Sequence, residues 1–218
     1  INNKNSLTAR GVGFMGFSIF GKDITFALKE NMEIDWKVVT DFSNKYKNQN
    51  VLIFGLTSVI WKNFLEVAMK LKKRLSLNKS ILIHGGGWKK LSEENISNEL
   101  FKKNYYKIFG SKFIHNYYGM IEQTGSIFME CEYGYFHTSI YSEIYVRDNN
   151  FKLLKNGKKG IVQILSLLPT SYPGHNILSE DRGIIYGEDN CKCGRMGKYF
   201  KILGRVKQAE IRGCSDAV

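Results

Sequence analysis

Proline and cysteine are both scarce in this chain, which has two prolines and four cysteines among 218 residues. In a cytosolic chain of this size we expect no disulfide framework. No apolar run approaches the roughly 20 residues of a membrane span, and the first residues lack a signal-peptide pattern. We therefore expect a cytoplasmic protein without a membrane span. The many Lys, Asn and Ile residues beside so few prolines indicate a compositional bias rather than a function.

Acidic residues are outnumbered, with 20 Asp and Glu against 32 Lys and Arg and a net charge of +12. Such a balance is typical of nucleic-acid-binding proteins. The basic residues, however, are spread over Lys70–Lys79, Lys102–Lys112 and Lys152–Lys159 without a recognisable DNA- or RNA-binding motif. We interpret them as a solvated surface that favours anionic ligands such as ATP, and we expect no nucleic-acid partner.

Apolar periodicity in the first part of the chain predicts an α/β fold. Short apolar runs at Val51–Phe54, Ile81–Ile83 and Lys112–Asn116 resemble strands buried on both faces. Helical patterns separate them, so we expect a parallel βαβαβ sheet with right-handed crossovers. With 43% hydrophobic residues, the chain can build one large domain or two small ones.

Four further segments carry local signals. We expect a hairpin at Gly13–Leu28 and a short amphipathic helix at Asp35–Lys47. Thr57 or Ser58 is expected to cap a helix whose apolar stripe reaches Leu75. A second long helix is expected over residues 92–109, capped by Ser92 and stopped by Gly110.

From Phe128 onward the apolar period changes to two. Tyr135–Val146 and Gly160–Leu168 alternate apolar and polar residues, and Gly183–Gly187 adds a short piece. Alternation of this kind predicts an antiparallel β subdomain packed on the α/β one. We place the α/β nucleotide-binding subdomain at residues 1–130 and the β subdomain at residues 131–218.

The segment His115–Ser126, HNYYGMIEQTGS, follows the third expected strand. Loops at the carboxyl ends of parallel strands are where α/β proteins bind ligands. Tyr118 offers an aromatic face for a base, and Glu122 offers a carboxylate for a hard cation such as magnesium. The glycines after the second strand should reach the same sheet edge. The alternative interpretation is a tight turn at Gly119 with a solvated glutamate.

Three cysteines and one histidine form a second candidate site. Cys131 and His137 have the spacing C-x5-H, and Cys191 and Cys193 form C-x-C. Three thiols and one imidazole make a closed tetrahedral zinc set. The alternatives are ordinary buried cysteines, or His175 as the fourth ligand in place of His137.

The His115–Ser126 segment resembles the core signature of the adenylate-forming superfamily, which includes acyl-CoA ligases and firefly-type luciferases. More of the chain resembles one branch, the bacterial acyl-protein synthetases, also described as long-chain-fatty-acid luciferin-component ligases. The matching segments run in order along the chain at Ala9–Asp23, Val51–Trp61, His84–Lys90, Ser166–Gly183 and Cys191–Asp216. Related phenylacetate-type ligases are similar in their Cys, His and C-x-C arrangement.

This resemblance implies roles for individual residues in binding ATP. Tyr118 would stack on adenine, Asp181 would bind the ribose hydroxyls, and Arg205 would contact the ribose or a phosphate. Glu122 would hold Mg²⁺. The backbone would approach adenine at Gly85, Gly86 and Gly87. Without the resemblance, we would interpret Asp181 as support for the turn at Gly183 and Arg205 as a surface residue.

Cys214 lies near the end of the chain, two residues from Arg212. A neighbouring cation lowers a thiol pKa, and an exposed tail gives reach. In the resembled synthetases a cysteine close to the C-terminus accepts the acyl group from the adenylate, and Cys214 matches that position. The alternative is a free thiol at a frayed end.

The resemblance also implies that the chain is a piece of the family domain. It opens on Ile1, and the Ser/Thr/Gly-rich phosphate loop of the family has no counterpart, since Gly11–Gly16 lacks Lys, Ser or Thr at the required spacing. We expect the N-terminal part of the domain to be missing. From the resemblance to acyl-protein synthetases we also expect no counterpart of the mobile C-terminal domain of acyl-CoA ligases, with its catalytic lysine.

The leading hypothesis is therefore an acyl-protein synthetase that uses ATP and Mg²⁺ to convert a fatty acid, or another carboxylic acid, into an acyl-AMP and then a protein thioester. The resemblance implies an acyl-reductase or acyltransferase subunit as partner. A catalytically incomplete fragment acting as a scaffold is the alternative, and a basic nucleic-acid-binding zinc module comes third. The sequence does not indicate the length of the acyl chain.

Overall fold

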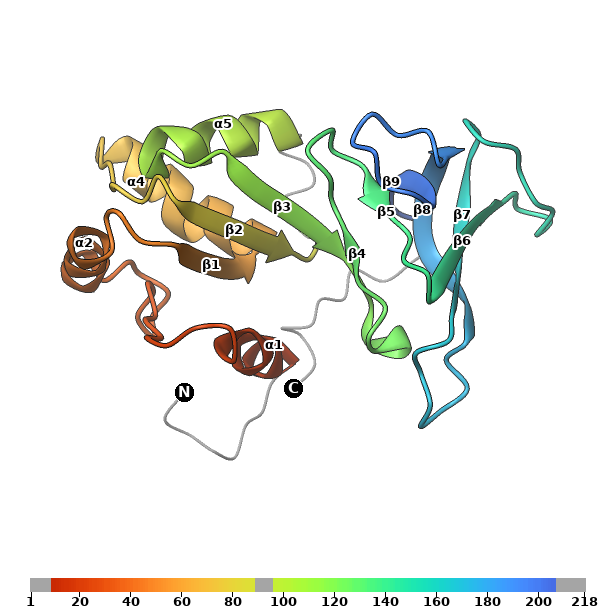
Figure 1. Ribbon diagram of the computed structural model, residues 1–218, viewed down its shortest axis with the longest axis horizontal. Helices are drawn as coiled ribbons and strands as arrows, with labels where there is room; N and C mark the ends of the chain where they lie inside the picture. The colour runs from red at the N-terminus through yellow and green to blue at the C-terminus, as the bar shows by residue number, and fades with distance from the viewer. Residues whose placement is uncertain (1–8, 89–95, 207–218) are drawn as a thin grey trace. The chain divides into compact units, whose positions relative to one another are not determined.

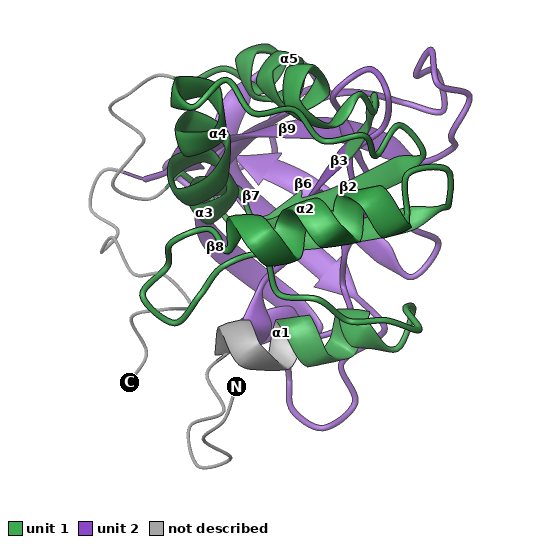
Figure 2. Ribbon diagram, turned by 90° about the vertical axis from the view of Figure 1, so that its left-hand side faces the viewer, with its two compact units in different colours: residues 1–114, 211–218 green, residues 115–210 purple. Residues whose placement is uncertain are grey.

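The computed structural model describes residues 9–88 and 96–206 (Figure 1). The described residues up to Ile114 form one compact unit, and those from His115 onward form a second (Figure 2). The first unit is α/β and the second is built mainly from antiparallel strands. The predicted fold class, a parallel α/β part followed by a smaller antiparallel part, is confirmed.

The parallel sheet of the first unit begins with β1 (Val51–Leu56) and β2 (Ser80–Gly85). These strands pair in parallel, with Val51 opposite Ser80 and Leu56 opposite Gly85. The strand β3 (Phe113–Tyr118) starts in this unit, and the order of the four-stranded sheet is β1-β2-β3-β4. The predicted strand order along the chain is therefore correct.

Two helices of the first unit have the expected boundary signals. The helix α2 (Trp36–Lys45) begins after Asp35, whose carboxylate accepts a hydrogen bond from the backbone N–H of Val38 at 3.1 Å. The helix α5 (Asn98–Phe109) is capped by Ser97 and ends at Gly110. It begins six residues later than predicted, and the expected cap at Ser92 lies outside the described residues.

The connection from β1 to β2 differs from the single capped helix that we expected. It consists of α3 (Thr57–Val59), the π-helical segment η1 (Ile60–Leu65) and α4 (Glu66–Lys70). No side chain caps its start, because the Thr57 hydroxyl bonds to residues of β2 instead. Leu75 is buried but not helical, since its N–H donates to the carbonyl of Ile108 at the end of α5.

The predicted hairpin at Gly13–Leu28 is wrong. Its first part belongs to the helix α1 (Ala9–Ser18). Phe14 and Phe17 are three residues apart and therefore lie on one helical face. Both contact Phe54 of β1, with ring centroids 5.5 Å and 3.8 Å away. Packing of these aromatic rings overrides the short alternating pattern that indicated strands.

The core of the first unit is formed by side chains from its strands and helices. Figure 1 shows α4 and α5 running alongside β1 and β2. Leu82 of β2 and Ala68 of α4 are fully buried there, together with Phe101 and Tyr105 of α5. These contacts hold β2, and therefore the glycines at its end, in a fixed position.

The second unit contains a five-stranded antiparallel sheet with the order β5-β9-β8-β7-β6. The long strand β8 extends well beyond the short piece predicted at Gly183–Gly187, and β9 is a strand that the sequence reasoning missed. The strands are β5 (Phe136–His137), β6 (Ser142–Arg147), β7 (Lys159–Ser166), β8 (Asn176–Glu188) and β9 (Lys198–Arg205). The short β4 (Phe128–Met129) pairs with the end of β3.

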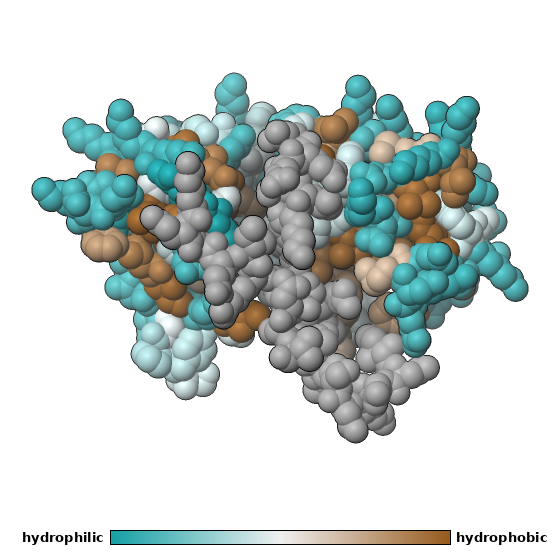
Figure 3. Space-filling view, turned by 180° about the vertical axis from the view of Figure 1, so that it is seen from behind, coloured by the Kyte–Doolittle hydropathy of each residue, from teal (hydrophilic) through white to brown (hydrophobic). Residues whose placement is uncertain are grey.

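A separate apolar core lies in this second unit. Phe128, Phe200 and Ile144 are essentially inaccessible to solvent, and Tyr118 packs against them. On the face seen in Figure 3, hydrophilic side chains project around exposed apolar residues. Among the described residues, no helix is both long and apolar enough to cross a bilayer.

The buried position of Leu82 predicts a large effect on stability. We expect Leu82→Ala to lower the free energy of unfolding by about 2–5 kcal/mol, because it leaves a cavity in the first core. The neighbouring Ile81 is 44% exposed, so Ile81→Ala should cost less than about 1 kcal/mol. Urea denaturation followed by circular dichroism measures both variants. Equal losses would contradict the assignment of Leu82 to the core.

Candidate functional site

Tyr118 lies at the end of β3 and connects the core of the second unit to a carboxylate. Its ring centroid is 6.1 Å from that of Phe128 and 6.4 Å from that of Phe200. Its hydroxyl donates a hydrogen bond of 2.6 Å to Oδ2 of Asp181. Burial, reinforced by the charge of Asp181, raises the pKa of Tyr118 far above its usual value. The hydroxyl therefore stays a donor at neutral pH, and stacking of this ring on adenine remains a prediction.

Asp181 is the carboxylate that Tyr118 contacts, and it lies in the middle of β8. Burial raises the pKa of Asp181, while the hydrogen bond from Tyr118 and the charge of Arg205 act to lower it. The backbone N–H of Asp181 donates to the hydroxyl of Ser179 at 3.1 Å. Asp181 is thus more than the support for a turn, because its side chain takes part in a partly buried polar network.

Arg205 lies directly across the sheet from Asp181, at the end of β9. Its guanidinium forms an ion pair with Glu180, the residue before Asp181. The side chain of Arg205 is 40% exposed, so solvent screens this pair and its contribution to stability is small. The register of two strands therefore brings together two of the predicted nucleotide-binding residues, Asp181 and Arg205.

Glu122 occupies the short 3-10 helix η3 (Ile121–Gln123), and its side chain is exposed. The backbone around it is held firmly by its neighbours. The fully buried amide of Gln123 donates to the carbonyls of Ile164 and Gly174, at 3.3 Å and 2.9 Å. The Tyr172 hydroxyl accepts a hydrogen bond from the backbone N–H of Thr124 at 3.0 Å. A carboxylate on an anchored turn can bind a hard cation such as Mg²⁺.

Gly119 separates Tyr118 from this turn. A Cβ atom added at Gly119 would lie 3.1 Å from the carbonyl oxygen of Ser126. Ser126 is itself held by a hydrogen bond of 2.7 Å from its hydroxyl to that of Ser166. The absence of a side chain at Gly119 therefore allows the two ends of the loop to approach closely.

In the first unit, the predicted adenine-contacting backbone follows β2. The Thr57 hydroxyl donates to the carbonyl of Gly85 at 3.1 Å and lies 2.9 Å from Nδ1 of the buried His84. Gly86 has a backbone φ of 76°, and Gly87 follows it. This network fixes the strand end from which Gly85, Gly86 and Gly87 leave the sheet.

The second unit also brings together the four predicted zinc ligands. The ligand atoms of Cys131, His137, Cys191 and Cys193 all lie within 4.8 Å of one another. His137 supplies the histidine, whereas His175 is exposed and outside this cluster. Zinc itself stays a prediction.

The ionisation of this cluster follows from its surroundings. Burial raises the pKa of the Cys191 thiol to about 11. Burial also acts to raise the pKa of Cys193, but hydrogen bonds from the backbone N–H of Arg195 and from the neighbouring thiols lower it overall. Burial and the charge of Arg195 lower the pKa of His137, so its ring is neutral at pH 7. A neutral imidazole is the form that binds metal ions.

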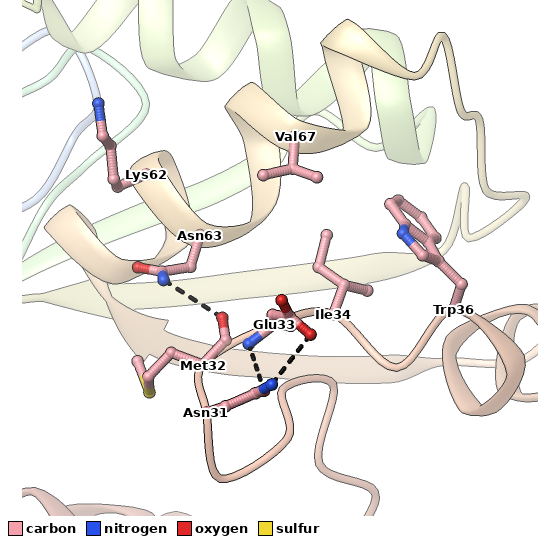
Figure 4. A pocket seen from close by; sticks show the side chains of 8 residues that line it. All are labelled: Asn31, Met32, Glu33, Ile34, Trp36, Lys62, Asn63 and Val67. Atoms are coloured by element: carbon pink, nitrogen blue, oxygen red, sulfur yellow. Dashed lines mark hydrogen bonds between the residues drawn. The ribbon is translucent and has the colours of Figure 1, made fainter.

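One surface pocket contains none of the predicted site residues. Its volume is about 440 Å³, and it lies in the first unit beside the π-helical segment η1 (Figure 4). The amide of Asn63 donates to the carbonyl of Met32 at 3.2 Å, and Asn31 donates to Glu33 at 2.9 Å. The side-chain amides of Asn31 and Asn63 are thus bonded within the pocket lining, and Lys62 forms an ion pair with Glu66, so nothing here favours a particular ligand.

Sequence reasoning missed the residues that support the site. Gln123, Tyr172 and Thr57 all lie within segments noted in the sequence, but their supporting roles depend on partners distant in the chain. No local pattern signals the contacts of Gln123, because its partners are backbone carbonyls 41 and 51 residues away. Cys214, the predicted acyl acceptor, lies outside the described residues.

Comparison with known proteins identifies the family. The sequence profile of the family described as "Acyl-protein synthetase, LuxE" matches residues 2–218. The chain belongs to this family. None of the curated proteins is similar enough in sequence to match.

Solved structures with a similar fold include CoA ligases and a luciferase-like enzyme. A 2-hydroxyisobutyryl-CoA ligase bound to 2-HIB-AMP and CoA has a TM-score of 0.65 and 18% identity, over 93% of this chain and 44% of that one. The luciferase-like enzyme of the nonluminescent mealworm Zophobas morio has a TM-score of 0.55 and 12% identity, over 93% and 47%. This member of the acyl-protein synthetase family therefore spans less than half the length of either enzyme.

A third solved structure, the anthranilate CoA ligase AuaEII with anthranoyl-AMP, has a TM-score of 0.51 and 12% identity, over 78% of this chain and 32% of that one. At these identities the likeness shows the fold. It agrees with the expected α/β class of the acyl-protein synthetase family.

The hydrogen bond between Tyr118 and Asp181 predicts a measurable change in pKa. Tyr118→Phe removes the donor while Asp181 stays buried, so we expect the pKa of Asp181 to rise further. Carboxyl carbon chemical shifts in an NMR pH titration measure this value. As a control, Tyr186→Phe changes a tyrosine on β8, the strand that carries Asp181, and should leave the pKa of Asp181 unaltered. An unchanged or lower pKa in Tyr118→Phe would contradict the arrangement.

The same burial sets the direction of a pH effect on stability. Because the folded-state pKa of Asp181 is raised, the folded protein binds the proton more tightly than the unfolded chain does. The contribution of Asp181 to stability is therefore present below its unfolded pKa and is lost as the pH rises through the folded pKa. The pH range between the unfolded and the folded pKa of Asp181 should become wider in Tyr118→Phe, because the folded pKa rises further. It should stay the same in Tyr186→Phe.

Proposed function

We propose that this chain carries the nucleotide-binding and acyl-accepting parts of an ATP-dependent acyl-protein synthetase. The single observation that carries the proposal is the family match over residues 2–218, which covers every residue of the candidate site. The hydrogen bond from Tyr118 to Asp181 and the position of Arg205 opposite Asp181 on the neighbouring strand support it, because the family resemblance assigns these residues to nucleotide binding.

The proposed reaction has two steps. In the first, an oxygen of the substrate carboxylate forms a bond to the α-phosphorus of ATP, and the bond from that phosphorus to pyrophosphate breaks. In the second, the thiolate of Cys214 attacks the acyl carbon of the acyl-AMP, and AMP leaves. The products are pyrophosphate, AMP and an acyl thioester on the protein. We propose a fatty acid as the substrate, and an acyl-reductase or acyltransferase subunit in the cytoplasm as the next acceptor.

The residues of the second unit have distinct proposed roles in the first step. Asp181 accepts hydrogen bonds from the ribose hydroxyls of ATP, and Tyr118 holds that carboxylate in place. Arg205 places a positive charge beside the ribose or a phosphate. Glu122, exposed on its anchored turn, fits a Mg²⁺ ion, which neutralises phosphate charge when bound. In the first unit, Gly85, Gly86 and Gly87 would present backbone groups to adenine.

The acyl-transfer step gives a direct test by mass. After incubation with ATP, Mg²⁺ and a series of fatty acids, the intact mass of the chain should increase by one acyl group, and hydroxylamine should remove it. Cys214→Ser should abolish the adduct, because a serine hydroxyl is a far weaker nucleophile than a thiolate at neutral pH. The adjacent variant Ser215→Ala should keep the adduct.

Two outcomes would decide against parts of this assignment. An adduct that persists in Cys214→Ser and is still removed by hydroxylamine would place the acyl group on another cysteine. An adduct formed only after the chain is extended with the N-terminal segment of a longer family member would assign the activity to the longer protein. In that case this chain alone would act as a binding or scaffold piece.

The proposed magnesium ligand predicts a shift in cation dependence. Glu122→Gln removes one anionic ligand, so we expect the Mg²⁺ concentration for half-maximal ATP–pyrophosphate exchange to rise roughly tenfold or more. Glu188→Gln removes an exposed carboxylate elsewhere in the second unit and should leave this concentration unchanged. A reduced maximal rate with an unaltered Mg²⁺ dependence would rule out Glu122 as a ligand.

A further inference from the structure

The four Cys and His side chains come from two turns at one end of the five-stranded sheet. Cys131 precedes β5, and His137 is the last residue of that strand. Cys191 and Cys193 lie in the loop that joins β8 to β9. Because β5 pairs with β9, with His137 opposite Tyr199, the two turns meet in space although they are more than 50 residues apart in sequence.

The two turns have the same local form. The carbonyl of Cys131 accepts a hydrogen bond from the N–H of Gly134 at 2.9 Å, and the carbonyl of Cys191 accepts one from Gly194 at 3.0 Å. Both glycines have positive φ, at 76° and 77°, a conformation that other residues rarely adopt. In the second turn, the N–H of Arg195 also points at the sulfur of Cys193, at 3.4 Å. The first turn presents one thiol and the second turn presents two, and all three sulfur atoms lie close together.

The separations of the ligand atoms fit a single small ion. Zinc bound by sulfur at about 2.3 Å and nitrogen at about 2.0 Å in a tetrahedron leaves about 3.5–3.8 Å between ligand atoms. The sulfur of Cys193 and Nε2 of His137 are 3.3 Å apart, and all four atoms lie within 4.8 Å of one another. Cys131, Cys191 and Cys193 form no disulfide, which would need about 2.0 Å between sulfurs.

Charge and burial also favour a cation. With a divalent ion bound, three thiolates give the site a net charge of −1, which Lys192 of the same loop can offset, whereas Arg195 forms an ion pair with Glu132 at 3.2 Å. Cys131, His137 and Cys191 are buried and Cys193 is partly exposed. Four protein ligands leave no open position for a substrate, which is the mark of a structural site.

We propose that Cys131, His137, Cys191 and Cys193 bind one structural Zn²⁺ ion that fixes the register of the β8–β9 hairpin. This hairpin has two register shifts, between Arg182 and Gly183 and between Ile185 and Gly187. The buried pair of Ile185 and Phe200 specifies the register in the middle of the hairpin, and a metal site would add a constraint at its loop end, where a slip of one residue would turn every side chain to the opposite face.

The metal site supplies that constraint at the loop end of the hairpin. It ties the loop after β8 to β5, the strand that pairs with β9 on its other side. Asp181 and Arg205 face each other at the opposite end of the same hairpin. Their alignment therefore depends on the register that the zinc ion holds. The relevance of this alignment to ATP rests on the proposed function, whereas metal binding does not.

The first experiment measures the metal. The full chain purified without chelator should contain about one zinc per chain. Replacement by Co²⁺ should give the thiolate-to-metal charge-transfer absorption of a tetrahedral site. Cys193→Ser and His137→Ala should each lose most of the metal. The variants His175→Ala and Cys214→Ser leave the four ligands intact and should retain it.

Two results would overturn the metal site. The first is wild-type protein with less than about one zinc per five chains together with no charge-transfer absorption on adding Co²⁺. The second is a loss of metal in His175→Ala as large as in His137→Ala. Because the Co²⁺ measurement uses the wild-type chain, it decides the question even where a cysteine variant fails to fold.

A second experiment tests the register. Amide hydrogen exchange, measured by mass spectrometry with and without a zinc chelator, should become faster in β5, β8 and β9 of the metal-free protein. The strands β1 and β2 belong to the first unit and should keep their protection, which gives an internal control. Unchanged protection of β9 in the metal-free chain would overturn the role of zinc in the hairpin. Neither measurement depends on ligase activity.

Discussion

The antiparallel pairing of β8 with β9 is the constraint on which the candidate sites of the second unit depend. Along this pair, Asp181 faces Arg205, and Ile185 faces the buried Phe200. The loop at the end of the pair carries Cys191 and Cys193. One hairpin therefore sets the polar network, the core and half of the Cys and His cluster. A shift in its register would disturb all three together, since alternate side chains point to opposite faces.

The sequence predicted the elements whose apolar pattern is strong and local. The strands near Val51 and Ile81, and the helix after Asp35, appear within a few residues of the expected bounds. The segment around Phe17 was misread, because its packing on a strand nearly 40 residues away decides its conformation. The strand β9 was missed, because Lys198–Arg205 contains three charged and four apolar residues without clear alternation.

The candidate sites divide in the same way. The chemistry of thiols and imidazole limits their combinations, so cysteine and histidine spacing alone could suggest the cluster. Sequence left His137 and His175 both open, and only the pairing of β5 with β9 decides between them. The bond from Tyr118 to Asp181 spans 63 residues and could not be read from any local pattern. Support from Gln123 was equally hidden, because its partners are backbone carbonyls.

The link between Tyr118 and Asp181 explains how a partly buried carboxylate can serve as a preformed acceptor. Burial of an ionised group is costly unless hydrogen bonds offset the loss of water. The Tyr118 hydroxyl provides one such bond at Oδ2, and the ring is immobilised by the aromatic core behind it. A carboxylate offers about four acceptor positions, so further donors can be bound. Two adjacent hydroxyls, such as those of a ribose, would complete this solvation without requiring Asp181 to move.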